Sequence, residues 1–199
     1  MNVTLYGADR NRTARCLWTL DEARVEYTFI DRNDLASREE LRQFHPLAKV
    51  SVAVIDGRNL FESAAICTHI ADRVPDADLI AKSGTFARAE HDQWVSFCLT
   101  EMEAWLSNSF VNTYVLPEDE RISAGLAQNA KMFKRAASVL DAHLAEHDYL
   151  VEDRFTVTDI IVAWCSNWGR RQDLLDECPA LVRYLERLMT RPHCSLIRD

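Results

Sequence analysis

The chain has 199 residues, of which 48% are hydrophobic and 27% are charged, and its formal net charge is −8 at pH 7. The negative charge argues against a nucleic-acid partner, because phosphates need a concentrated surface of Lys and Arg. No stretch approaches 18 uncharged apolar residues, and no basic segment followed by an apolar one opens the chain. We therefore expect a cytoplasmic protein with no membrane partner.

The cysteines and histidines indicate neither a disulfide framework nor a metal site. Six cysteines are scattered without a Cys-x-x-Cys pair, and an even count without a secretory leader does not define a disulfide framework. His143 and His147 have the i,i+4 spacing of metal ligands on a predicted helix, but no third ligand is evident nearby. We expect no metal and interpret both as solvated histidines near a helix end.

Residues 1–74 alternate between strand and helix patterns. Residues 3–6 have the pattern of a short strand, residues 12–23 that of a helix, and residues 26–30 that of a second strand. Two similar strands that flank one helix predict a right-handed parallel βαβ unit. Residues 37–44 have a helical pattern that ends at His45-Pro46.

A hairpin and a further helix follow. The β-branched run at residues 50–55 leads into Asp56-Gly57 and a return strand at residues 58–61, and an Asp-Gly pair is a hairpin signal. Glu62-Ser63 then opens a helix that ends near Val74. The order βαβ-α-ββα predicts a mixed four-stranded sheet with helices on both faces, which is the thioredoxin-like α/β plan.

Residues 75–84 are polar and lack periodicity, so we expect a linker there, and residues 85–199 have helical patterns throughout. Apolar residues recur every three or four positions within residues 94–106, 126–144, 160–168 and 181–189, as in core-facing helices. Thr156 and Asp159 have the spacing of a capping box, with Phe155 and Ile160 as its hydrophobic staple. The sequence predicts an all-α C-terminal domain.

Five segments in this order resemble the glutathione transferase family, especially its bacterial-type members, and the likeness covers nearly the whole chain. No single segment is decisive, but the order of all five is specific. The segments are Leu5-Tyr6-Gly7 with Arg12 and Leu17-Trp18, the run from His45 to Val52, the run from Leu60 to Ile66, the capping box, and the run from Cys178 to Leu181 with Arg191-Pro192.

The resemblance implies that glutathione binds the N-terminal domain as a co-substrate. Ser63, at a helix start, suits the γ-glutamyl carboxylate, because a hydroxyl, an amide and the positive helix end meet there. Glu62 would orient the same end of the ligand, and Lys49 would neutralise the glycyl carboxylate. The backbone of Val50 would pair with the cysteinyl amide as an added strand does. An ordinary helix start and a surface lysine are the alternatives.

The chain departs from the family pattern at two positions. Ser51 stands where the family has a proline preceded by a cis bond, and a cis bond between two other residues is rare and costly. We therefore expect a trans Val50–Ser51 bond and altered glutathione binding. Asn11 stands where many members have the Ser or Cys that donates to the glutathione thiolate. Asn11 with Thr13 resembles members related to disulfide reductases, and Tyr6 is a second candidate donor or simply a packed strand residue.

Arginines 10, 12 and 15 surround the Asn11 loop, where they would favour an anion or form a solvated helix face. In the helical domain, Trp105, Asn108 and Phe110 are candidates for an apolar pocket that takes a small hydrophobic electrophile. Two hypotheses stay open: an enzyme that conjugates glutathione or reduces disulfides with it, and a non-catalytic binding or interaction module of the same fold. The family also implies a homodimer.

Overall fold

The computed structural model describes residues 1–8, 10–35 and 38–196. The chain divides into two compact units, and each is described by itself. The first unit consists of Met1–Lys82 together with the C-terminal segment that begins at Arg191, and the second unit consists of Ser83–Thr190. The sequence pattern did not indicate that the C-terminal segment would join the first unit.

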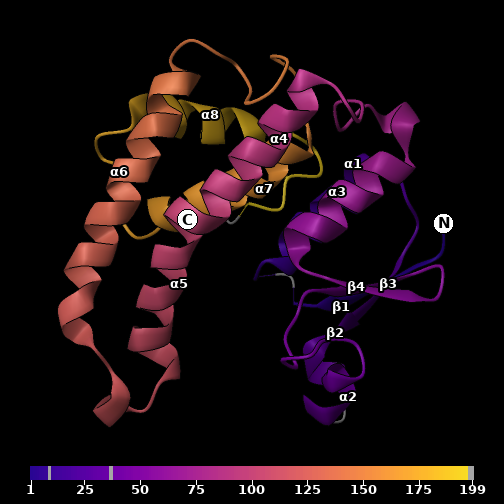
Figure 1. Cartoon of the computed structure of the whole chain (residues 1–199), viewed down its shortest axis with the longest axis horizontal. Coiled ribbons are helices and arrows are strands. Elements are labelled where there is room, and N and C mark those ends of the chain that lie inside the picture. The colour runs from indigo at the N-terminus through magenta and orange to yellow at the C-terminus, as the bar shows by residue number, and fades with distance from the viewer. Residues whose placement is uncertain (9, 36–37, 197–199) are drawn as a thin grey trace. The chain divides into compact units, whose positions relative to one another are not determined.

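The first unit is a four-stranded mixed sheet with helices on both faces (Figure 1). Its strands are β1 (Val3–Gly7), β2 (Thr28–Asp31), β3 (Val52–Ile55) and β4 (Arg58–Phe61), in the order β2-β1-β3-β4. β1 pairs with β2 in parallel, whereas β3 is antiparallel to both β1 and β4. The predicted thioredoxin-like plan is confirmed.

Three helices accompany this sheet: α1 (Thr13–Glu22), α2 (Arg38–Arg42) and α3 (Ser63–Arg73). α1 and α3 pack side by side on one face, and α2 lies toward the other (Figure 1). Alternation along β1 buries its odd-numbered residues, so the core of the unit lies between that face and the two helices. Helix α2 is shorter than the predicted residues 37–44, of which Ser37 lies outside the described residues.

The predicted hairpin forms around Asp56 and Gly57. Both residues have positive φ, 49° and 80°, the requirement of the tight turn that joins two twisted strands. The Asp56 carboxylate also accepts a hydrogen bond from the Asn2 amide at 2.9 Å. The turn therefore fixes both the register of the hairpin and the start of β1.

The C-terminal segment is held against α1 by an ion pair. Arg191 donates from Nε and Nη2 to the two carboxylate oxygens of Glu22, each at 2.8 Å, and Ser195 Oγ donates to the Ala14 carbonyl at 2.9 Å. Burial alone would raise the pKa of Glu22, but the hydrogen bonds from Arg191 and Trp18 lower it.

The second unit is helical throughout its regular elements. It contains α4 (Phe86–Phe97), α5 (Ala104–Phe110), α6 (Leu126–Leu144), α7 (Val157–Arg170) and α8 (Pro179–Met189). Wider π-helical turns at Cys98–Glu103 and Val111–Val115 continue α4 and α5. The core forms where α7, which is buried along most of its length, packs between the other helices. The all-α prediction for this region is confirmed.

The capping box predicted at the start of α7 is present. The Thr156 amide donates to Asp159 Oδ2 at 2.7 Å, and the Thr156 hydroxyl caps the first turn in return. Asp159 Oδ1 accepts two more hydrogen bonds, from the Leu150 amide at 3.1 Å and from Tyr184 Oη at 2.8 Å. The box therefore ties α7 to a loop and to α8.

Candidate functional site

Three chain segments that are distant in sequence converge in the first unit: the first turn of α1, the residue before β3 and the start of α3. Thr13 Oγ1 and Ser51 Oγ are 2.8 Å apart, and Arg15 Nη1 donates to Ser63 Oγ at 3.2 Å. These four side chains are all nearly or completely buried. Polar side chains gathered at one end of a sheet, with a helix start among them, form a site suited to an anionic ligand.

Asn11 lies immediately before Arg12, the N-cap residue of α1. Its Oδ1 accepts a hydrogen bond from the Thr13 amide at 2.8 Å, which satisfies one of the amides left over at a helix start. Because the oxygen is used in this way, the Nδ2 group is the part of the side chain left to donate to a ligand. Asn11 is half-buried.

The peptide bond between Val50 and Ser51 is cis. The sequence-based expectation of a trans bond is therefore wrong. That expectation considered only the absent proline and not the surroundings of Ser51, which is 5% exposed and hydrogen-bonded through its hydroxyl to Thr13. Lys49 is exposed and Val50 is half-buried.

Glu62 has an unusual backbone conformation directly before α3. Its φ is 71° and its ψ is 114°, a region that is sparsely populated by residues with a side chain, and strained residues of this kind cluster at ligand sites. Within the described residues, the Glu62 side chain makes no hydrogen bond that caps α3. The exposed carboxylate and the positive end of an 11-residue helix thus lie next to each other.

Replacing Glu62 with glycine should raise the free energy of unfolding by about 1 kcal/mol, because glycine tolerates positive φ. Urea unfolding measures this change. Glu186→Gly is the matched control: Glu186 is exposed in the middle of α8, and the loss of helix propensity there should lower stability by about 1 kcal/mol. If both variants were destabilised equally, the conformation of Glu62 would carry no strain.

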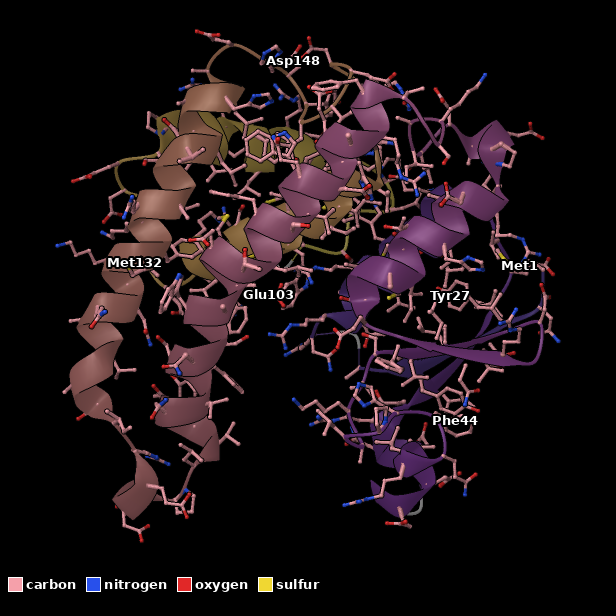
Figure 2. The ribbon with its side chains drawn as sticks, viewed as in Figure 1. Met1, Tyr27, Phe44, Glu103, Met132 and Asp148 are labelled. Carbon is pink, nitrogen blue, oxygen red and sulfur yellow. The ribbon has the colours of Figure 1, made fainter. Side chains whose placement is uncertain are left out.

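Thr13 and Tyr6 have different surroundings in the structure. Thr13 is completely buried, so it supports the site through Ser51. Tyr6 stacks on Phe44, with ring centroids 4.7 Å apart, and Phe44 lies beside α2 (Figure 2). The residues alternate along β1, so Tyr6 faces away from α1 and α3. Its role as a thiolate donor stays a prediction.

Arg15 is the residue of the site whose environment the sequence did not resolve. A solvated helix face and a role in the local potential both remained open. The side chain is 0% exposed and contacts Ser63. The available signal was its position on the same helical face as the buried Thr19, four residues later.

Two family models match the chain. Residues 1–72 match the N-terminal domain of glutathione S-transferase, and residues 94–192 match its C-terminal domain. The chain belongs to the glutathione transferase superfamily.

Among superfamily relatives, glutathione S-transferase GST-4.5 of Xanthomonas campestris is 26% identical over 82% of this chain and 80% of the relative. Elongation factor 1-gamma of Prunus avium is 31% identical over 77% of this chain, which spans only 36% of that protein. The theta class glutathione S-transferase of Xanthomonas axonopodis, solved with glutathione bound, has a TM-score of 0.79, 24% identity, and coverage of 99% of this chain and 98% of that one. This last likeness shows the fold.

In the helical unit of this superfamily member, the three candidate substrate residues have different surroundings. Trp105 lines a cavity of about 180 Å³ between α5 and α6. Asn108 is exposed, and its Oδ1 accepts a hydrogen bond from Asn129 Nδ2 at 2.8 Å. Phe110 belongs to an aromatic row, with ring centroids 5.4 Å from Tyr114 and 6.1 Å from Trp168. Asn129, the partner of Asn108, lines the same cavity as Trp105, and a substrate pocket formed by the three residues stays a prediction.

The described residues contain neither a cluster of metal-ligating side chains nor a membrane-spanning helix. Among residues 1–8, 10–35 and 38–196, no three His, Cys, Asp or Glu side chains gather as a metal site would need. His143 and His147 stack on each other at 4.5 Å, and His147 Nδ1 lies 3.1 Å from the Asp153 carboxylate. No helix in the part of the chain that the structure describes is long and apolar enough to cross a membrane.

Proposed function

We propose that this protein binds glutathione at the converged site and transfers it to small hydrophobic electrophiles. The contact between Arg15 and Ser63 is the observation that carries the proposal. Ser63 Oγ accepts from the guanidinium, so its own proton is left to donate to a carboxylate. The buried cation and the start of α3 add positive potential at the same point, which matches the γ-glutamyl carboxylate.

Glutathione supplies its own nucleophile, so the protein needs only to stabilise the thiolate. The pKa of a thiol, normally near 8.5, must fall by about 2 units for the thiol to be mostly ionised at neutral pH. This shift requires the thiolate to be stabilised over the thiol by about 2.7 kcal/mol. Asn11 Nδ2 is the donor whose orientation is fixed by the hydrogen bond that Asn11 Oδ1 accepts from the Thr13 amide. It would donate to the thiolate without exchanging a proton, while the thiolate attacks the electrophile and the leaving group departs.

Calorimetry with glutathione tests this proposal. Wild-type protein should bind glutathione at or below millimolar concentration, and Ser63→Ala should weaken binding at least tenfold, because a hydrogen bond to a charged group is lost. Ser138→Ala is the matched control, since Ser138 is exposed on α6 and bonds only to a carbonyl of its own helix. No heat at millimolar glutathione would overturn the proposal.

A non-catalytic binding module is the second candidate function. The similarity to elongation factor 1-gamma favours it, because that relative is named for translation elongation and not for transfer of glutathione. Absence of glutathione binding in the calorimetry, in a protein that is folded, would favour this candidate over the enzyme. A cytoplasmic location and a role in detoxification belong to the enzyme proposal and stay predictions.

We further propose a homodimer that uses the outer face of α4 and α6. A shallow groove of about 220 Å³ lies there, with apolar walls and one charge of each sign, lined by Phe97, Glu101, Met132, Arg135, Ala136 and Val139. Met132 is visible on α6 in Figure 2, and Val139 is 47% exposed. Light scattering should give twice the chain mass of 22.8 kDa, and a mass of one chain at micromolar concentration would contradict the dimer.

A further inference from the structure

Two cysteines from different helices face each other in the core of the first unit. Cys16 on α1 and Cys67 on α3 are both 0% exposed, and their sulfur atoms are 4.0 Å apart. Both are free thiols. A disulfide needs a sulfur separation of about 2.05 Å, so an approach of about 2 Å, divided between two side chains on two packed helices, would join them.

The surroundings of the two thiols differ. Burial would raise the pKa of both. For Cys67, hydrogen bonding with Cys16 and Thr19 and the nearby charge of Arg15 outweigh burial and lower the pKa. For Cys16, burial dominates and its pKa rises. Cys16 is the thiol of the pair that contacts the converged site, through Ser63 and Ser51, and in either cysteine the thiolate is the reactive form.

The thiol pair lies one layer below the converged site. Cys16 Sγ donates to the Ser63 carbonyl at 3.8 Å and also contacts the Ser51 side chain. Ser51 and Ser63 are each 5% exposed, so a small opening at these two residues would expose the sulfur atoms. A disulfide held at the glutathione site would then be the nearest oxidant.

We propose that Cys16 and Cys67 form a reversible disulfide by exchange with glutathione disulfide. The choice of oxidant rests on the proposed function, whereas the disulfide itself does not. One of the two cysteines, as its thiolate, attacks one sulfur of glutathione disulfide, which forms a mixed disulfide and releases one glutathione. The other cysteine gives up its proton and attacks the protein sulfur of the mixed disulfide, which releases the second glutathione. Two protein thiols and one glutathione disulfide thus become one protein disulfide and two glutathione thiols.

Thiol counting by mass spectrometry tests this site in the native 199-residue chain. The reduced protein is treated with glutathione disulfide or with diamide, then unfolded and alkylated. Of its six cysteines, we expect four to be alkylated, with the peptides of Cys16 and Cys67 linked, and all six after reduction. Cys16→Ser and Cys67→Ser should each keep all five remaining thiols. Cys98→Ser, also fully buried but in the other unit, should still lose two.

The outcomes separate the disulfide from the proposed function. Six alkylated cysteines after both oxidants, a link between other cysteines, or a lasting glutathione adduct would overturn the proposal. A Cys16–Cys67 link that forms with diamide but not with glutathione disulfide would support the protein disulfide and would overturn the proposal that glutathione disulfide is its oxidant. A link that forms while calorimetry detects no glutathione binding contradicts only the proposed function. The peptide map uses wild-type protein, so the result stands even if a serine variant fails to fold.

Discussion

Replacing Asp159 with asparagine is expected to lower the free energy of unfolding by about 3 kcal/mol. The two carboxylate oxygens accept four hydrogen bonds, from the Thr156 amide and hydroxyl, the Leu150 amide and Tyr184 Oη. A carboxamide has one acceptor oxygen, so its NH₂ group would face two of these buried donors. Each buried donor without a partner costs about 1–3 kcal/mol. Urea unfolding at pH 7 measures the change.

Asp92→Asn is the matched control for Asp159→Asn, because Asp92 is exposed on α4 and its ion pair with Arg88 is long, at 3.9 Å. A surface pair of this kind contributes little, so the control should change stability by less than about 0.5 kcal/mol. Equal effects of the two substitutions would show that the four hydrogen bonds do not stabilise α7.

The same carboxyl should make stability depend on pH. Burial raises the pKa of Asp159 to about 6 despite the hydrogen bonds that lower it, whereas the unfolded chain has a value near 3.9. The folded state therefore binds the Asp159 proton more tightly than the unfolded state does. The stabilisation that results is fully present below about pH 4 and is lost as the pH rises through 6. The stability difference between wild type and Asp159→Asn should therefore widen by about 1 kcal/mol from pH 7 to pH 5. If the stability difference narrowed instead, the four hydrogen-bond donors would lower the pKa of Asp159 by more than burial raises it.

Replacing Gly7 with alanine should cost about 3 kcal/mol of stability and abolish glutathione binding. A Cβ at position 7 would lie 2.2 Å from both Thr13 Cγ2 and Thr13 Oγ1. Thr13 is buried, and its hydroxyl is held by Ser51. Relief of the clash therefore has to move β1 away from α1, and overpacking of this kind costs about 1–3 kcal/mol or more. Thermal unfolding and calorimetry with glutathione measure the two effects.

Gly125→Ala is the control for Gly7→Ala, because nothing lies within 4 Å of an added methyl group there and the φ of −79° suits alanine. The double variant Gly7→Ala with Thr13→Ala should recover only part of the stability, since Thr13 Cβ still lies 2.6 Å from the new methyl. Wild-type stability of Gly7→Ala would contradict the close approach of β1 and α1.

Local signals were sufficient to predict the elements. The tight turn of the hairpin requires two consecutive residues with positive φ, and few residue pairs other than Asp-Gly and Asn-Gly adopt it. Asp56 and Gly57 both have positive φ. The capping box needs Thr156 and Asp159 three residues apart, and both of its hydrogen bonds form. In each case the residues that determine the local structure lie within four consecutive positions, so they can be recognised directly in the sequence.

The candidate site required contacts between distant residues, and there the sequence was insufficient. The environment of Ser51 depends on Thr13, 38 residues away, and that of Arg15 depends on Ser63, 48 residues away. Neither partner can be found by periodicity. The expected trans bond at Val50–Ser51 was wrong for this reason, because the rule applied to it considers only residue types along the chain.

The ion pair between Glu22 and Arg191 has a consequence for how the chain is made. The two residues are 169 positions apart, and a ribosome adds about 5–20 residues per second. About 10–30 seconds therefore pass between the synthesis of Glu22 on α1 and the synthesis of its partner Arg191. During this interval every residue of the helical unit is synthesised. The first unit to emerge is thus among the last parts of the molecule to reach its final form.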